Sequence, residues 1–299
     1  HDGFRVYCKK PENGTAQAEK GADMRIRNRS LEGGWYPGDE EGVRAAVDEW
    51  ERTLEADPDR TAGAGVAPHA GWYFSRRLAW DTLRRARTDA ETVIVAGGHR
   101  PPGSAPLAAE EEAFRTPLGL VPADRELAEA LGAYVPLEAD RWGDNTVEVL
   151  LPLVRLRFPE ARVLWLRVPN DDSAENLGAA AARAAADLGR KTFFLASTDL
   201  THYGPGYGFC PKGRGPEAQE WVRYVNDRGF LDALLALDSR DVIRRGNEDR
   251  AACSPGAAAA AIGFARALGF TNPKLCGYYT SRDVQASESF VGYGSVVFE

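Results

Sequence analysis

Short apolar runs alternate with longer segments in which apolar residues recur at helical spacing, from Met24 to the end of the chain. Apolar runs bounded by turn residues are typical of buried strands. The clearest are residues 65–68, 92–96, 161–168 and 192–196, and two closing strands are predicted at residues 274–280 and 290–298. Strands that alternate with helices indicate a single three-layer α/β domain, with a mostly parallel central sheet flanked by helices.

The segments between these strands carry the helical patterns. Helices are predicted over residues 40–55, 76–87, 124–133, 145–157, 174–188, 216–237, 239–246 and 255–268. The last has a favourable start at Ser254-Pro255, because proline is pre-organised for the first position of a helix. Residues 114–121 predict a hairpin that turns at residues 117–119, and residues 101–112 predict a long loop.

The first part of the chain has a different composition from the rest. Residues 1–23 are polar and lack periodicity, and the only methionine, Met24, follows them directly. We expect residues 1–23 to be a polar N-terminal extension, either natural or appended. We find neither an internal repeat nor a linker after Met24, and therefore predict one domain over residues 24–299.

Charge and composition exclude some classes of partner. The net charge of −7 argues against non-specific binding of nucleic acid, and no apolar run is long enough to predict a membrane span. The four cysteines, Cys8, Cys210, Cys253 and Cys276, form no CxxC pair. Scattered cysteines favour a reducing compartment, so a cytoplasmic location is expected. The sequence does not specify an oligomeric state.

Three histidines, His69, His99 and His202, each follow a strand-like run. The carboxyl ends of parallel strands share one edge of a sheet, where open α/β folds bind their ligands. We therefore expect these three side chains to converge on one site. Converging imidazoles are typical of a metal site or of acid–base chemistry.

Cys253 lies directly before the predicted helix at residues 255–268. The N-terminus of a helix favours the thiolate, although a buried and inert thiol is the alternative interpretation. With two of the histidines, Cys253 could form a His-His-Cys centre that leaves positions open for substrate, water or dioxygen.

Other polar and aromatic residues have both a functional and a structural interpretation. Asp199 and His202 could form an acid–base pair or orient a ligand, or they could be a helix cap and a surface histidine. Asn145 and Glu148, at the start of a predicted helix, could contact a substrate or cap that helix. The aromatic residues that could line a pocket or fill the core are Trp35, Trp72, Tyr73 and Tyr203.

Several blocks together resemble the Memo family. Residues 67–75 read APHAGWYFS, similar to the family signature APHAGYxYSG, and residues 34–39 resemble its opening loop. Later blocks follow in the family's order at residues 114–119, 144–152, 197–204, 278–283 and 291–294. The family is similar in fold to the class III extradiol ring-cleaving dioxygenases, which use non-haem Fe(II), so the resemblance implies that fold.

The resemblance also implies roles for individual residues. His69, His99 and Cys253 would be the metal ligands, with Cys253 where the dioxygenases have glutamate. Asp199 would lie beside the metal, and His202 would occupy the acid–base position. The implied cofactor is Fe(II), with copper or zinc as alternatives.

The implied function is a mononuclear non-haem metal-dependent oxygenase or oxidase that acts with dioxygen on a small molecule or a peptide. One alternative is a metal-binding module for peptide recognition or redox signalling, without turnover. The other is a zinc-dependent hydrolase, in which the metal activates a water molecule.

The chain departs from the family pattern near the expected site. Arg76 replaces a usual glycine, Ser254 replaces the glycine after the cysteine, and residues 97–99 read Gly-Gly-His where the family has Gly-Pro-Ser/Asn-His. We expect Arg76 and Arg100 to add positive charge near the mouth of the site and so to favour an anionic substrate.

Overall fold

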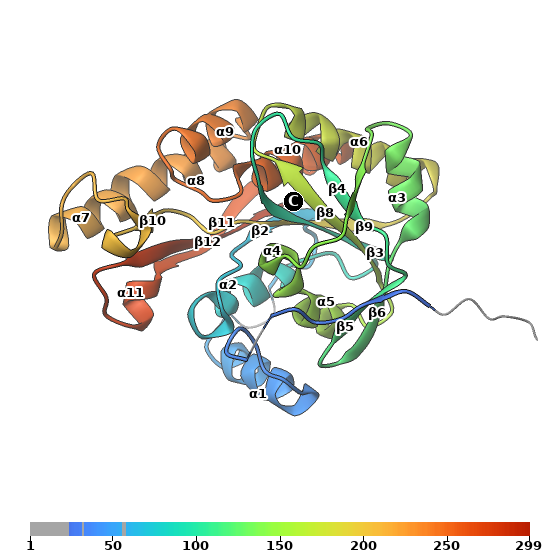
Figure 1. Cartoon of the computed structure of the whole chain (residues 1–299), viewed down its shortest axis with the longest axis horizontal. Coiled ribbons are helices and arrows are strands. Elements are labelled where there is room, and N and C mark those ends of the chain that lie inside the picture. Colours follow the sequence, from blue (N-terminus) through green and yellow to red (C-terminus); the bar gives the residue numbers. More distant parts are fainter. Residues whose placement is uncertain (1–23, 32, 56–57) are drawn as a thin grey trace, which may run out of the picture.

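The structure is a computed structural model that describes residues 24–31, 33–55 and 58–299. The predictions for residues 1–23 and Cys8 lie outside these residues. The α/β fold with a mostly parallel central sheet is confirmed (Figure 1). Parallel pairing joins its four central strands: β2 (Ala64–Ala67), β9 (Thr192–Ser197), β3 (Thr92–Arg100) and β8 (Arg162–Pro169).

Further strands extend this sheet on both sides. Next to β2 lies the antiparallel strand β12 (Phe290–Phe298). Two further strands, β10 (His202–Tyr203) and β11 (Pro273–Thr280), pair antiparallel with β12. Beyond β8 lie β4 (Leu107–Ala109) and β7 (Glu138–Asp140). A separate small sheet contains β1 (Ile26–Arg27), β5 (Ala113–Thr116) and β6 (Gly119–Pro122), and its β5–β6 pair confirms the predicted hairpin.

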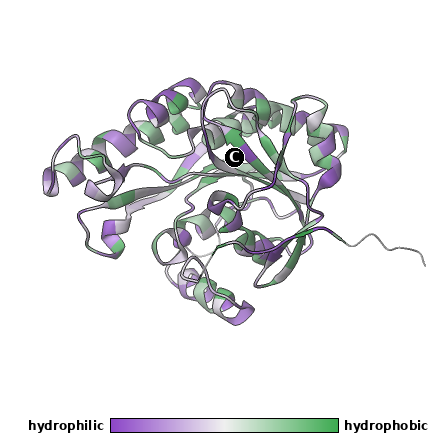
Figure 2. Ribbon diagram, in the orientation of Figure 1, coloured by the Kyte–Doolittle hydropathy of each residue, from purple (hydrophilic) through white to green (hydrophobic). Residues whose placement is uncertain are grey.

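Side chains of the central strands alternate between two apolar cores, one on each face of the sheet. In β3, Ile94 and Ala96 pack into one core, and Val93 and Val95 pack into the other. Successive side chains of a strand point to opposite faces, so a strand buried on both faces is apolar throughout. Hydrophobic residues accordingly concentrate in the sheet and on the helix faces that meet it (Figure 2).

Helices cover both faces of the sheet (Figure 1). One core is closed by α3 (Arg125–Gly132), α6 (Ser173–Asp187), α8 (Asp227–Leu235), α9 (Ser239–Asn247) and α10 (Pro255–Leu268). The other is closed by α1 (Glu40–Glu51), α2 (Trp72–Arg84), α4 (Asn145–Glu148) and α5 (Leu151–Arg157). Three short helical elements lie beside the sheet edge that carries β10: η1 (Pro205–Tyr207), α7 (Pro216–Trp221) and the π-helix η2 (Val222–Asn226). A fourth short helix, α11 (Ser281–Val284), follows β11.

Helices α6 and α10 contact each other through their backbones. A Cβ atom added at Gly178 would lie 1.8 Å from the carbonyl oxygen of Ala260, and one at Gly263 would lie 2.0 Å from that of Glu175. Most other residues at this contact are alanines. The small residues of these helices are therefore required for the packing that holds α10, and with it the segment containing Cys253, against the sheet.

The structure differs from the sequence-based prediction where tertiary contacts decide local structure. The predicted loop at residues 101–112 contains β4, which is stabilised by pairing with distant β8. The helix expected from Arg76 begins at Trp72, and β3 continues beyond its apolar run, so that His99 lies within the strand. Among the described residues, no helix combines the length and apolarity needed to cross a membrane.

Candidate metal centre

His69 is held by bonds to both its backbone and its ring. It follows β2, its side chain is 2% exposed, and its backbone N–H donates to Asp199 Oδ1 at 2.7 Å. Its ring Nδ1 lies 2.9 Å from Ser197 Oγ, and that hydroxyl donates its proton to the carbonyl of Thr146. Ser197 must therefore accept from Nδ1–H, which leaves the lone pair of the ring on Nε2.

His99 is positioned by two glycines that allow a close approach of α4. A Cβ atom at Gly97 would lie 2.2 Å from Thr146 Oγ1. Gly98 has a φ of +95°, which favours glycine, and its N–H donates to the same hydroxyl at 2.7 Å. The pairing of β3 with β8 shifts register here, and His99 reaches the cavity with its ring centroid 5.3 Å from that of His69.

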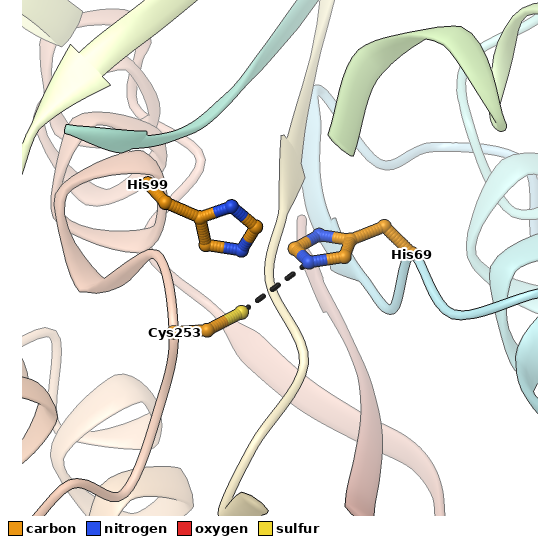
Figure 3. Close-up of side chains that lie close together, drawn as sticks. All are labelled: His69, His99 and Cys253. Atoms are coloured by element: carbon orange, nitrogen blue, oxygen red, sulfur yellow. Dashed lines mark hydrogen bonds between the residues drawn. The ribbon is translucent and has the colours of Figure 1, made fainter. Parts of the chain in front are cut away.

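Cys253 approaches both histidines from the segment before α10. Its backbone N–H donates to the carbonyl of Asp199 at 3.2 Å, and its Sγ lies 3.3 Å from His69 Nε2 (Figure 3). One potential ligand atom from each of His69, His99 and Cys253 lies within 4.8 Å of the other two. The three side chains could therefore hold one metal ion.

Desolvation by the surrounding protein favours the uncharged form of all three groups, although only His69 is buried, Cys253 is half-buried and His99 is exposed. Desolvation lowers the pKa of His69 to about 4, and it also lowers the pKa of His99, with a further contribution from His69. Burial, together with Asp199, raises the pKa of the Cys253 thiol to about 12. Neutral imidazoles are ready to bind a metal, whereas the thiol must release its proton when it does so.

Asp199 and His202 lie beside these three residues. Asp199 is buried, accepts from the backbone N–H groups of His69 and Ala70, and has its Oδ2 4.0 Å from His69 Nε2. Burial raises the pKa of Asp199. The Nδ1 of His202 lies 3.1 Å from the carbonyl oxygen of Leu200, so Nδ1 carries a proton and Nε2 can accept one. Burial lowers the pKa of His202, which favours the neutral ring.

A cavity of about 370 Å³ opens over this group. Its lining includes His69, His99, Asp199 and His202, together with two of the predicted substrate-binding residues, Trp35 and Asn145. The sequence analysis did not single out the remaining polar and aromatic part of the wall: Phe74, Tyr207, Ser281, Gln285, Ser287, Ser289 and Tyr293. Residues 284–289 carry no pattern beyond that of a polar loop, although the family-like blocks at residues 278–283 and 291–294 flank them.

Four other residues predicted to bind substrate lie outside the cavity lining. Trp72 and Tyr203 are buried in apolar clusters, and the Trp72 indole donates to the carbonyl of Val149. Glu148 is buried and accepts from the backbone N–H groups of Ser30 and Leu31 and from the Tyr36 hydroxyl. Tyr73 is 64% exposed.

Arg76 and Arg100 are also missing from the cavity lining, so neither side chain forms part of the wall of the metal cavity. Arg100 donates to the carbonyl of Ala105 in the loop after β3. Arg76 is turned away along α2, where it packs against Trp50 and Trp72.

Replacing Ser197 with alanine should weaken metal binding about 10- to 100-fold, because the ring of His69 loses the acceptor that fixes its orientation and tautomer. The matched control is Ser295→Ala. Ser295 is also buried in the sheet, where its hydroxyl bonds with Thr82. Titration of both variants with a divalent metal by calorimetry tests this expectation. Equal affinities in the two variants would contradict it.

The fold and these converging donors define an α/β protein with a candidate mononuclear metal centre. The sequence profile described as "Memo-like protein" matches residues 27–297, and the chain belongs to the Memo family.

Curated relatives include two archaeal proteins named "MEMO1 family protein". The one from Thermococcus onnurineus is 30% identical, and the match covers 91% of this chain and 99% of that protein. The one from Pyrococcus abyssi is 33% identical over the same shares of the two chains. A solved structure of an uncharacterized protein from Escherichia coli K12 is similar in fold alone, with a TM-score of 0.50 and 14% identity over 80% of this chain and all of that one.

Proposed function

We propose that this protein is a mononuclear, iron-dependent oxygenase or oxidase that acts on a small organic molecule. The observation that carries this proposal is the convergence of His69, His99 and Cys253 within 4.8 Å, beside a cavity that His202 also lines. Two imidazole nitrogens and a thiolate suit iron, copper and zinc, and three protein ligands leave positions open to the cavity. A metal ion held there would supply Lewis-acid and redox chemistry.

His202 is the group that would move protons. Because its ring is neutral near pH 7 and its Nδ1 is bonded to the carbonyl of Leu200, Nε2 can accept a proton from a substrate hydroxyl. The neighbouring Asp199 favours the charged form of the ring, and would therefore stabilise the imidazolium after that transfer.

The cavity wall suggests the kind of substrate. Trp35, Phe74, Tyr207 and Tyr293 provide aromatic surface, and Asn145 with the serines of residues 281–289 provides hydrogen-bonding groups. A volume of about 370 Å³ is at the lower end of the range of small-molecule sites. We therefore propose a small, flat, hydroxylated molecule, or a peptide side chain of that type.

We also propose a reducing location such as the cytoplasm. Cys253 binds a metal only as a thiolate, and oxidation would remove it from the ligand set. Among the described cysteines, Cys210, Cys253 and Cys276 are free thiols.

Oxygen uptake by the reconstituted protein tests the proposal. The protein is loaded anaerobically with Fe(II), Cu(I) or Zn(II), mixed with a panel of phenols and catechols, and followed with an oxygen electrode. We expect uptake that depends on both Fe(II) and substrate. His202→Gln should keep its iron and lose about 100-fold or more in rate, whereas Cys276→Ser should behave as wild type. Turnover with zinc and without oxygen would replace this proposal with a hydrolase, and peptide binding without turnover would replace it with a recognition module.

A further inference from the structure

A second cleft, of about 410 Å³, lies on the other side of Phe74 from the metal cavity. It is lined by Trp50, Trp72, Tyr73, Arg76, Arg77 and Tyr279. Phe74 lines both spaces, and the short helix α11 also separates them. Ser281 of α11 lines the metal cavity, whereas Asp283 and Val284 line the second cleft.

Arg76 is the unusual residue in this cleft. It is only 7% exposed, and its buried Nε has no hydrogen-bond partner among the residues that the structure describes. Its guanidinium lies over two indole rings, 5.1 Å from the centroid of Trp50 and 5.0 Å from that of Trp72, and forms no ion pair with any described residue. Aromatic faces stabilise a cation only in part and offer no hydrogen-bond acceptor. Burial accordingly lowers the pKa of Arg76 to about 9.

The other charges of the cleft do not neutralise Arg76. Arg77 donates to the hydroxyl and carbonyl of Thr53, and within the described part of the chain it has no carboxylate partner. The carboxylate of Asp283 pairs with Arg223 at 2.6 Å and accepts from the backbone of Thr280. The cleft therefore combines an excess of positive charge with a wall of aromatic rings.

We propose that this second cleft binds a small organic anion, a carboxylate or phosphate carried on a flat apolar body, with its anionic group on Arg76 and its body against Trp72, Tyr73 and Tyr279. A guanidinium presents several donors in a planar fork that matches carboxylate and phosphate oxygens. Bound in this way, the anion supplies the acceptor and the opposite charge that Arg76 lacks. The site does not require the metal centre and is independent of the function proposed above.

Calorimetric titration of the full chain with benzoate, phenyl phosphate, inorganic phosphate and uncharged benzamide tests the proposal, with tryptophan fluorescence as a second readout. We expect benzoate or phenyl phosphate to bind at least about tenfold more tightly than benzamide. Arg76→Gln should weaken that binding at least tenfold, and His69→Ala should leave it unchanged.

The matched control is Arg157→Gln, because Arg157 also lies over an aromatic ring, that of Phe158, but outside the cleft. Binding of inorganic phosphate with the affinity of phenyl phosphate would remove the apolar body from the proposal and so overturn it.

A second pair of variants covers the case in which Arg76→Gln does not fold. Val284 is 40% exposed at the rim, so Val284→Glu adds a negative charge without disturbing the core, and Val284→Gln is its neutral counterpart. We expect the glutamate variant to bind benzoate at least threefold more weakly than the glutamine variant at low salt. Equal affinities in this pair, unchanged affinity in Arg76→Gln, or no binding of either organic anion to the wild type would overturn the proposal.

Discussion

His69→Ala and Cys253→Ala are each expected to lose metal affinity by more than about 100-fold, because each removes one of the three donors that lie within 4.8 Å of one another. Both variants should remain folded, since neither side chain belongs to an apolar core. Elemental analysis after anaerobic reconstitution and desalting would measure the loss. Cys276→Ala is the matched control, because Cys276 is a free cysteine outside the candidate ligand set. Full metal content in both ligand variants would contradict the assignment of the site.

The pH dependence of metal binding should distinguish the ligand that must release a proton, the thiol of Cys253, from the imidazole of His69, which is already neutral. The raised pKa of Cys253, about 12, means that the thiol must lose a proton on binding at any pH near neutral, whereas the pKa of His69, about 4, means that this ring is already neutral. Wild-type affinity should therefore rise about tenfold for each pH unit between about pH 6 and pH 8. Cys253→Ala should show a much flatter dependence.

The second large effect is expected on stability. Gly178→Ala should lower the free energy of unfolding by about 3 kcal/mol, because the added Cβ would lie 1.8 Å from a backbone oxygen of α10 and the two helices would have to separate. Urea unfolding followed by circular dichroism would measure this change. Metal binding should weaken as well, because α10 begins just after Cys253.

The control for this variant is a glycine-to-alanine substitution at a helix position where the added methyl group meets no neighbouring atom. A Cβ atom at Gly132, at the end of α3, would meet nothing within 4 Å. Gly132→Ala should therefore leave stability unchanged or raise it by up to about 1 kcal/mol, through the helix propensity of alanine. A loss in Gly178→Ala no greater than the change in Gly132→Ala would show that α6 and α10 do not depend on this close contact.

The sequence predicted the parts of the fold whose signal is local. The central strands are buried on both faces, so each is a continuous apolar run that predicts a strand directly. Helix α10 begins and ends at the predicted residues, 255 and 268. Strands β4 and β7 have no such signal. Each has only three residues, and they depend on pairing with each other and, for β4, with β8. Their existence follows from the assembled sheet.

For the candidate site, the sequence by itself determined that His69, His99 and His202 each come after an apolar, strand-like run and that Cys253 precedes a helix, because buried strands and helix starts are encoded within a few residues. Only the tertiary structure brought Cys253 Sγ to 3.3 Å from a histidine that is distant in the chain. It also decided that Trp35 faces the cavity while Tyr203 fills a core, and that Arg76 lies in a separate cleft. The direction in which an aromatic or charged side chain points depends on how helices pack against the sheet, and no local pattern carries that information.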